Sequence, residues 1–438
     1  MVAAAFAAIL LFVGTWLVLH VGFYEHRQIR DTPVYQHYGN AIANGKVPYR
    51  DFAVEYPPGA LPMFALPGLA KPGRDQDVSE GFRRTFETLM WICGAAALAA
   101  MALVFRALRR PIVSVWIALA FAALAPLALG SVILSRYDLW PVAIVVAALA
   151  ALVAGRVRVG HALLGLGIAA KLYPAVLVPL AVAFAWKRAG RREALICTGV
   201  VIAVAALIFV PFVALSPGGV WHSVSVQLGR PLQVESLGSA VLLAAHHAFG
   251  LGVSSETSHG SQNLAGDGAD AVAIAATVLQ VTALVWIWAA FVRSAGSREA
   301  LVRASAAALC AFVALGKVLS PQFLIWLIPV LPLVRGRRGL WVSTLLAAAL
   351  VLTQLWFPFR YFRLALDFEP GLSWLLLGRD LVLVAIVAVL VPRLHEEDGG
   401  RSVSQRALHY RSKMNAALRL RRVGELLQGA APASTARP

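Results

Sequence analysis

The sequence predicts an all-helical protein that crosses a membrane several times. Of its 438 residues, 59% are apolar and only 14% are charged, whereas soluble domains carry about 25% charged residues. The apolar residues gather in runs, several of them near the length of about 20 residues that a helix needs to cross a bilayer. Clusters of Lys and Arg between these runs alternate with acidic segments. These observations are typical of a multi-pass protein of the plasma membrane.

Eight apolar runs are predicted to be membrane crossings. They lie near residues 2–23, 85–106, 112–130, 139–155, 194–215, 271–292, 340–357 and 372–392. The first run has no basic start and exceeds the roughly 7–15 apolar residues of a signal peptide, so we expect a retained anchor. The last run is interrupted by Arg379 and Asp380, which can pair or sit at its outer interface. Residues 59–70 form a run of only about 12 residues, which favours a re-entrant or interfacial segment.

The charge distribution predicts which segments face the cytoplasm. The formal net charge is +17, and basic clusters recur between apolar runs at 106–110, 156–158, 187–192, 293–303 and 335–338. The positive-inside rule assigns these clusters to the cytoplasm and the acidic segments to the outside. Because the basic residues are divided among short loops, they form no single basic face, and we expect no nucleic-acid partner.

The chain divides into a membrane domain and a tail. Residues 1–395 are predicted to form one integral membrane domain, with the loops at 24–83 and 216–270 as an external lid. Residues 396–438 are basic and polar and end in small residues and proline. We expect this tail to be cytoplasmic and partly disordered.

Two stretches have basic residues at both ends but are too short to cross twice. They span residues 158–187 and 303–335, whereas two crossings need about 40 residues and a turn. We predict helical pairs that are short or broken, with the freed backbone near each proline enclosed by protein. Lys171 and Lys317 then lie at membrane depth, where each costs about 2.5–3.5 kcal/mol. Each lysine is expected to pair with a carboxylate, to reach outward to the interface, or to hold an anionic ligand.

The first outward loop brings carboxylates and tyrosines together just beyond a membrane exit. Its members are Asp31, Asp51, Glu55, Tyr35, Tyr38, Tyr49 and Tyr56. Such a cluster can bind a sugar and remove the proton of a hydroxyl. Asp31, which precedes Thr32-Pro33, is also typical of a helix N-cap. From the residues alone, the three carboxylates are nearly equal candidates for a general base.

Four motifs, taken in order, resemble those of glycosyltransferase family 87, a GT-C group of polytopic enzymes that use polyprenyl-phosphate sugars. They are D-x-x-x-Y from Asp31 with G-x-x-P-Y-x-D-x-x-x-E-Y-P-P from Gly45, then Gly165, Lys171 and Pro174, R-x-x-Q-x-E-S-L from Arg230, and K-x-x-S-P-Q-F-x-x-W from Lys317. The second motif is incomplete, because His161 stands where the family has a glycine.

The resemblance implies a GT-C helical core with an external, lipid-accessible cavity. It also implies inverting transfer of mannose or arabinofuranose from a polyprenyl-phosphate donor to a glycolipid or cell-envelope glycan. It favours Asp31 as the base, with Arg230, Lys171 and Lys317 on the donor phosphate and Gln322 and Glu235 as polar support. No cofactor or metal is expected, because cationic side chains can stabilise a phosphate leaving group.

Further substrate contacts are expected in two loops. In the first, these are Tyr35, Tyr49, Asp51 and Glu55, with Asp51 and Glu55 also able to pair with Arg30 or Arg50. Arg136 and Asp138 lie at a later outward turn, where they contact substrate or pair with each other.

The alternative is a secondary transporter or lipid flippase. Transporters use broken helices that carry charges inside the membrane, and Lys171–Pro174 and Lys317–Pro321 could be the trace of an internal repeat. However, the two halves of the chain show no other symmetry, and three carboxylates concentrate in one external loop. These features favour the enzyme.

Overall fold

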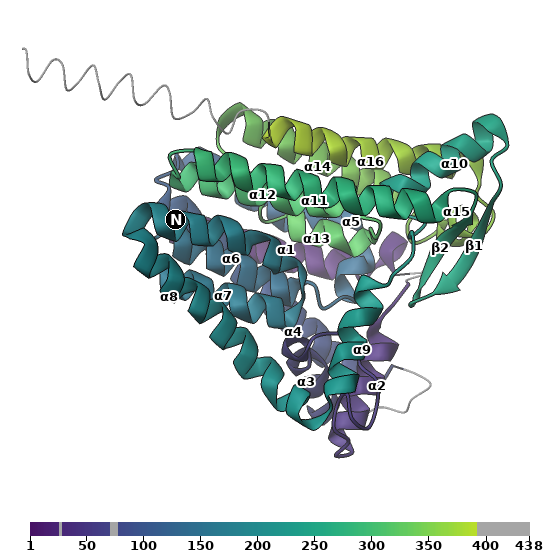
Figure 1. Cartoon of the computed structure of the whole chain (residues 1–438), viewed down its shortest axis with the longest axis horizontal. Helices are drawn as coiled ribbons and strands as arrows, with labels where there is room; N and C mark the ends of the chain where they lie inside the picture. The colour runs from purple at the N-terminus through teal and green to yellow at the C-terminus, as the bar shows by residue number, and fades with distance from the viewer. Residues whose placement is uncertain (26–28, 71–77, 392–438) are drawn as a thin grey trace, which may run out of the picture.

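The computed structural model describes residues 1–25, 29–70 and 78–391, so the predicted tail at 396–438 lies outside the described residues. Within them nearly every regular element is a helix (Figure 1). The helices are α1 (Val2–Val18), α2 (Thr32–Ala43), α3 (Pro62–Ala70), α4 (Glu80–Ala107), α5 (Ile112–Leu129), α6 (Leu139–Val153), α7 (Val157–Ala170), α8 (Val178–Leu215), α9 (Pro217–Leu228), α10 (Leu237–Phe249), α11 (Ala269–Arg293), α12 (Arg298–Leu315), α13 (Leu324–Leu327), α14 (Gly336–Gln354), α15 (Tyr361–Ala365) and α16 (Pro370–Leu390). The strands are β1 (Val253–Ser258) and β2 (Ser261–Gly266).

Five of the described segments are long and apolar enough to cross a membrane. They are α4, α5, α8 with the short helical turn before it (Tyr173–Leu215), α11 and α16. These correspond to five of the eight predicted crossings. The other three are helices as well, but α1 and α6 have only 17 and 15 residues, and α14 is not among the five. The prediction of a helical polytopic membrane protein is confirmed.

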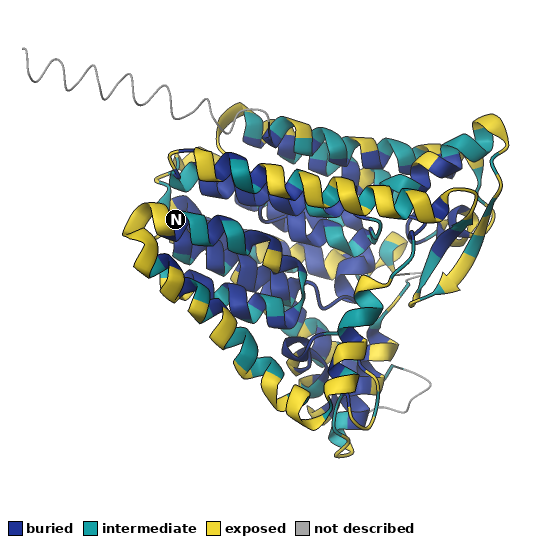
Figure 2. Cartoon of the chain, in the orientation of Figure 1, coloured by how far each residue is buried: buried dark blue, intermediate teal, exposed yellow. Residues whose placement is uncertain are grey.

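The outer faces of α8 and α11 are apolar and uncovered. Only 11% of the most apolar 18-residue stretch of each helix is buried. Figure 2 shows exposed positions along both helices. Large apolar side chains such as Ile202 (63% exposed), Leu207 (76%) and Ile274 (66%) lie there. A soluble protein rarely exposes such a contiguous apolar surface, and lipid is the solvent that suits it. By contrast, α12 packs inside the protein, with nearly every residue from Ala300 to Leu315 buried.

The basic clusters at the ends of the helices meet at one end of the molecule. Arg110 Nη2 lies 2.7 Å from Glu299 Oε2, and Lys187 Nζ donates a hydrogen bond of 2.7 Å to the Ser294 carbonyl. Clusters predicted to share one side of the membrane therefore contact one another. From this end α12 runs for about 27 Å, at 1.5 Å per residue, to Leu315.

Both predicted breaks occur as expected. After α7 the backbone of Lys171 is extended (φ −161°, ψ 143°), and a short helical turn at Tyr173–Leu177 leads into α8. After α12, Gly316 is extended, and short helical pieces replace a full crossing. The predicted crossing at 194–215 forms the second part of α8, which bends at Gly190 (φ 84°, ψ 177°). A side chain would strain the backbone in this conformation.

The loop that contains α2 and α3 is built on a close contact between these two helices. A Cβ atom on Gly39 would lie 2.5 Å from the Phe64 carbonyl oxygen, and one on Gly68 would lie 2.4 Å from the Gly39 carbonyl carbon. Only glycine permits two backbones to pack at this distance. The run at 59–70 forms a short turn followed by α3, which has 9 residues and cannot span a membrane.

The segment between α10 and α11 contains a β-hairpin that the sequence pattern did not predict. Strands β1 and β2 pair antiparallel from Val253↔Gly266 to Ser258↔Ser261. Two residues with positive φ connect them, His259 (54°) and Gly260 (65°). Such two-residue turns match the twist of a hairpin. The hairpin lies beside α10 and α15 at the end of the molecule away from the N-terminus (Figure 1).

Candidate active site

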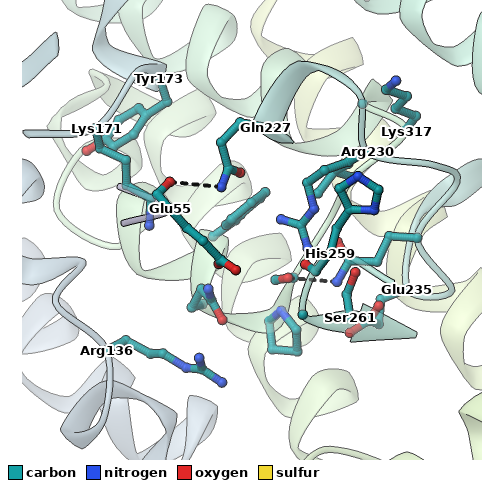
Figure 3. A pocket seen from close by; sticks show the side chains of 18 of the residues that line it. Glu55, Arg136, Lys171, Tyr173, Gln227, Arg230, Glu235, His259, Ser261 and Lys317 are labelled. Atoms are coloured by element: carbon teal, nitrogen blue, oxygen red, sulfur yellow. Dashed lines mark hydrogen bonds between the residues drawn. The ribbon is translucent and has the colours of Figure 1, made fainter. Parts of the chain in front are cut away.

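A cavity of about 670 Å³ lies at the end of α12 opposite the basic clusters. It brings together residues from all four motifs, although these motifs are spread from residue 31 to residue 326 (Figure 3). The predicted site residues that line it are Asp31, Glu55, Arg136, Lys171, Arg230, Glu235, Lys317 and Gln322. Apolar walls come from side chains such as Val176 and Phe312.

Asp31 lies at the edge of the cavity and forms an ion pair with Arg136. It occupies the N-cap position of α2, but its side chain makes no capping hydrogen bond. The Tyr35 hydroxyl donates a long hydrogen bond of 3.4 Å to the same oxygen, Oδ2, that faces Arg136. The side chain of Asp31 is 26% exposed and that of Arg136 is 7% exposed. Oδ1 of Asp31 accepts no hydrogen bond from the described residues, which leaves one carboxylate oxygen for a ligand.

Asp138 lies behind the cavity wall and joins two of the motifs. Its Oδ1 is 2.6 Å from Lys171 Nζ and accepts a hydrogen bond of 2.5 Å from Trp326 Nε1. Asp138 is fully buried. Arg136 and Asp138 therefore do not pair with each other, because each faces a residue from another part of the chain.

Aromatic rings enclose the ammonium group of Lys171. It lies 4.7 Å from the ring centre of Tyr137 and 5.2 Å from that of Trp326. Tyr173 stacks on Trp326, with ring centres 4.0 Å apart and planes within 5° of parallel. Cation–π contacts and the carboxylate of Asp138 together offset the loss of water around the ammonium. Lys171 is thus a neutralised cation at the cavity wall.

Two further cations line the cavity without a carboxylate partner within the described residues. Arg230 Nη2 donates a weak hydrogen bond of 3.4 Å to the His259 carbonyl, and its Nε is buried with no partner there. Lys317 Nζ donates to the Leu228 carbonyl at 3.2 Å. Figure 3 shows both on the side of the cavity that faces away from Lys171. Two cations that form no ion pair with a described residue suit an anionic group.

The segment from Arg230 to Ser236 is attached to the break after α12. The Gln233 backbone N–H donates to the Lys317 carbonyl at 3.0 Å, and the Gln233 side chain donates to Ser320 Oγ at 2.8 Å. The hairpin holds the other edge of the segment, since the Val234 N–H donates to the Gln262 carbonyl at 3.1 Å.

The two remaining cavity carboxylates differ in their surroundings. Glu235 is buried, and burial raises the pKa of its carboxyl to about 7, although the nearby charges of Arg379 and Arg230 act in the opposite direction. Glu55 is exposed, and its carboxylate points into the cavity while its backbone carbonyl accepts a hydrogen bond from Gln227 (Figure 3). Neither carboxylate forms an ion pair with a described residue.

Four predicted contacts lie outside the lining of the cavity: Tyr35, Tyr49, Asp51 and Asp138. Tyr49 is buried and donates a hydrogen bond of 2.6 Å to the Tyr56 carbonyl. Asp51 pairs with Arg50 at 2.9 Å, and this arginine lowers the pKa of the Asp51 carboxyl to about 2. Tyr49 and Asp51 therefore make contacts within the loop. Pairing with Arg50 was one of the expectations for Asp51.

Several cavity residues were missed in the sequence. Gln227, His259, Ser261 and Tyr361 all line the cavity. Two of them, His259 and Ser261, belong to the hairpin, whose His259-Gly260 turn is not among the dipeptides that usually signal a hairpin. Within the described residues no group of three or more His, Cys, Asp and Glu side chains is placed to hold a metal.

Comparison with models of known protein families identifies the family of this chain. The family model of glycosyltransferase family 87 matches residues 54–321. This chain belongs to glycosyltransferase family 87. It is therefore a membrane glycosyltransferase, and the family 87 assignment favours the enzyme over the transporter alternative. A comparison with curated proteins finds no match.

Two solved structures are similar to this family 87 chain at low identity. One is ArnT from Cupriavidus metallidurans bound to undecaprenyl phosphate, with 16% identity, a TM-score of 0.46, and coverage of 87% of this chain and 76% of ArnT. The other is the Archaeoglobus fulgidus oligosaccharyltransferase tethered to an acceptor peptide, with 14% identity, a TM-score of 0.43, and coverage of 89% and 54%. This chain thus spans about half the length of that second protein.

Proposed function

We propose that this family 87 enzyme transfers a hexose, with mannose as the first candidate, from a polyprenyl-phosphate donor to a glycolipid or cell-envelope glycan. The observation that carries the proposal is one cavity lined by the carboxylate of Asp31 and by two cations, Arg230 and Lys317, that form no ion pair with a described residue. A glycosyl phosphate needs both, a base for the acceptor and positive charge for the leaving group.

The donor phosphate fits best beside Arg230 and Lys317. A guanidinium can hold two phosphate oxygens at once, and an ammonium adds a point charge. Lys171 was expected to share this role, but Asp138 already neutralises it. We assign Lys171 to the wall of the site. The apolar residues Val176 and Phe312 suit the first isoprene units of the donor.

Asp31 is proposed as the base. Its Oδ1 accepts a hydrogen bond from the hydroxyl of the acceptor sugar. The oxygen of this hydroxyl forms a bond to the anomeric carbon as the bond from that carbon to the phosphate oxygen breaks. The hydroxyl proton passes to Asp31, and the electron pair of the broken bond leaves on polyprenyl phosphate. Attack opposite the leaving group inverts the anomeric centre. The ion pair with Arg136 stabilises the charged form of Asp31, so the carboxylate can take the proton as the new bond forms.

Acceptor binding is proposed on the side of Glu55 and Gln227. The Glu55 carboxylate points into the cavity and has no ion-pair partner among the described residues, so it is free to accept hydrogen bonds from sugar hydroxyls. The positive-inside rule favours a cytoplasmic location for the opposite end, where the basic clusters lie. On this assignment the cavity opens on the extracytoplasmic side, as the enzyme of a cell-envelope glycan requires.

The test is sugar transfer by purified protein in nanodiscs. Synthetic polyprenyl-phosphate mannose and polyprenyl-phosphate arabinofuranose are supplied separately with a glycolipid extract, and mass spectrometry distinguishes hexose from pentose products. We expect a hexose product. A pentose product would keep the donor class and replace the sugar. Consumption of neither donor, with movement of polyprenyl phosphate between leaflets of proteoliposomes, would contradict the proposal in favour of a flippase.

A further inference from the structure

A buried ion pair in the middle of α16 takes no part in the chemistry proposed above. Arg379 Nε and Asp380 Oδ1 lie 2.9 Å apart, and both side chains are 0% exposed. The sequence analysis left open whether these residues pair or sit at the outer interface, and they pair inside the protein. Charges inside a membrane span are expensive and are usually kept for a purpose.

The guanidinium of Arg379 makes one hydrogen bond within the described part of the chain. Its Nη2 donates to the backbone carbonyl of Glu235 at 2.8 Å. The guanidinium also lies 5.5 Å from the ring centre of Trp356, which is itself fully buried. The contact joins a membrane helix to the segment that supplies Arg230 and Glu235 to the cavity.

This segment is held at three places. Gln233 attaches it to the break after α12, and Val234 attaches it to the hairpin. Arg379 is the contact from α16, and it reaches the residue next to Ser236, the N-cap of α10. At the end of the segment nearest α10, Arg379 therefore contacts the backbone itself, beside the contact between the side chains of Tyr361 and Glu235.

We propose that Arg379 is a positioning residue of the active site, which fixes the backbone at Glu235 and thereby the placement of Arg230 toward the donor phosphate. Asp380, whose Oδ1 lies 2.9 Å from Arg379 Nε, supplies the opposite charge. The effect on the donor rests on the proposed function, whereas the effect on the segment itself does not.

Comparison with an apolar pair at the same position indicates what the charges of Arg379 and Asp380 contribute. Replacing a buried ion pair with apolar side chains of similar volume is often neutral or stabilising, so α16 would pack well without charges. A guanidinium at this position supplies what an apolar side chain cannot, a hydrogen bond to the carbonyl of a loop residue.

The test uses a double variant, Arg379→Met with Asp380→Leu, which removes both charges and leaves no unpaired one. The matched control is Arg110→Met with Glu299→Leu, because Arg110 likewise pairs with an acid at 2.7 Å and donates to a backbone carbonyl, Leu333, at 3.0 Å. Neither control residue lines the cavity. Arg379→Lys tests rescue, because it restores a cationic donor.

Two measurements are made on the folded proteins. The first is amide hydrogen exchange of residues 230–240, which we expect to be at least tenfold faster in the α16 variant and unchanged in the control. The second is donor kinetics, in which we expect KM to rise about tenfold or more with kcat within about threefold of wild type. Arg379→Lys should recover part of both.

The outcomes separate the two proposals. Unchanged exchange in residues 230–240 of the folded α16 variant would overturn the positioning role, whatever the enzyme's substrate. Faster exchange in a protein that does not bind polyprenyl phosphate would support positioning and contradict the proposed function. An equal rise in KM for the control variant would also overturn the inference, since any lost buried pair would then have the same effect.

Discussion

Asp138 and Lys171 form an ion pair inside the protein, with Oδ1 and Nζ 2.6 Å apart. The same oxygen accepts the indole N–H of Trp326, so one carboxylate links the turn before α6, the break after α7 and the break after α12. A neighbouring residue, Arg136, holds Asp31 in the same way. Residues 136–138 thus organise the wall of the cavity between the proposed base and the donor side.

Loss of the Asp138 charge should destabilise the protein strongly. Asp138→Asn leaves Lys171 without its counter-ion at a buried position, and breaking such a pair typically costs about 3–5 kcal/mol. We expect a clear fall in Tm, which is measured in detergent by intrinsic tryptophan fluorescence. Asp51→Asn is the control, because its partner Arg50 is 51% exposed, and its Tm should match wild type. Equal Tm values for both variants would show that the buried pair has no structural role.

Arg230 should matter for donor affinity rather than for stability. A hydrogen bond to a charged group contributes about 1.5–3 kcal/mol, so Arg230→Gln should raise the KM for a polyprenyl-phosphate sugar by more than about tenfold. Arg230→Lys should be intermediate, because a point charge lacks the fork geometry. Arg50→Gln, at an exposed arginine outside the cavity, serves as the control. If KM is unchanged in Arg230→Gln, the phosphate binds elsewhere.

Glu235 should make stability depend on pH. Burial raises the pKa of Glu235 from its usual value of 4.5 to about 7, so the folded state holds a proton that the unfolded state releases. Stability from this group is therefore fully retained below about pH 4.5 and falls as the pH rises toward 7. Wild type should lose Tm relative to Glu235→Gln between pH 5 and pH 8. A constant Tm difference across that range would mean that the Glu235 pKa is not raised.

The contact between α2 and α3 should be sensitive to a single methyl group. In Gly39→Ala the new Cβ meets the Phe64 carbonyl at 2.5 Å, and overpacking of this kind costs about 1–3 kcal/mol. Gly14→Ala in α1 is the control, because nothing lies within 4 Å of its Cβ position. We expect a lower Tm for the first variant only. Similar Tm values would show that the α2–α3 contact can open without loss.

Composition and helix-length arguments predicted the membrane core, and the two lysine–proline breaks followed from basic residues at both ends of short stretches. These are local properties of the sequence. The partner of Lys171 could not be chosen in the same way, because Asp138 is 33 residues away and becomes its neighbour only when α6 and α7 pack together.

The residues of the candidate site likewise differ in whether local sequence patterns could predict them. Motif spacing identified Asp31, Arg230 and Lys317, all of which line the cavity. It did not separate Glu55, which points into the cavity, from Asp51, which pairs with Arg50 outside it. The two carboxylates are only four residues apart, and the backbone turn between them decides which one faces the ligand. The hairpin was missed because its turn, His259-Gly260, is not one of the usual two-residue hairpin pairs.

Initial rates for wild type, Asp31→Asn and Glu55→Gln, measured with the same donor and acceptor, test whether Asp31 is the base of the glycosyl transfer. General base catalysis contributes about 10²–10⁴-fold. We expect a loss of this size in Asp31→Asn, with unchanged donor KM, and a loss below about tenfold in Glu55→Gln. Near-normal turnover by Asp31→Asn together with collapse in Glu55→Gln would contradict this expectation and would assign the base to Glu55.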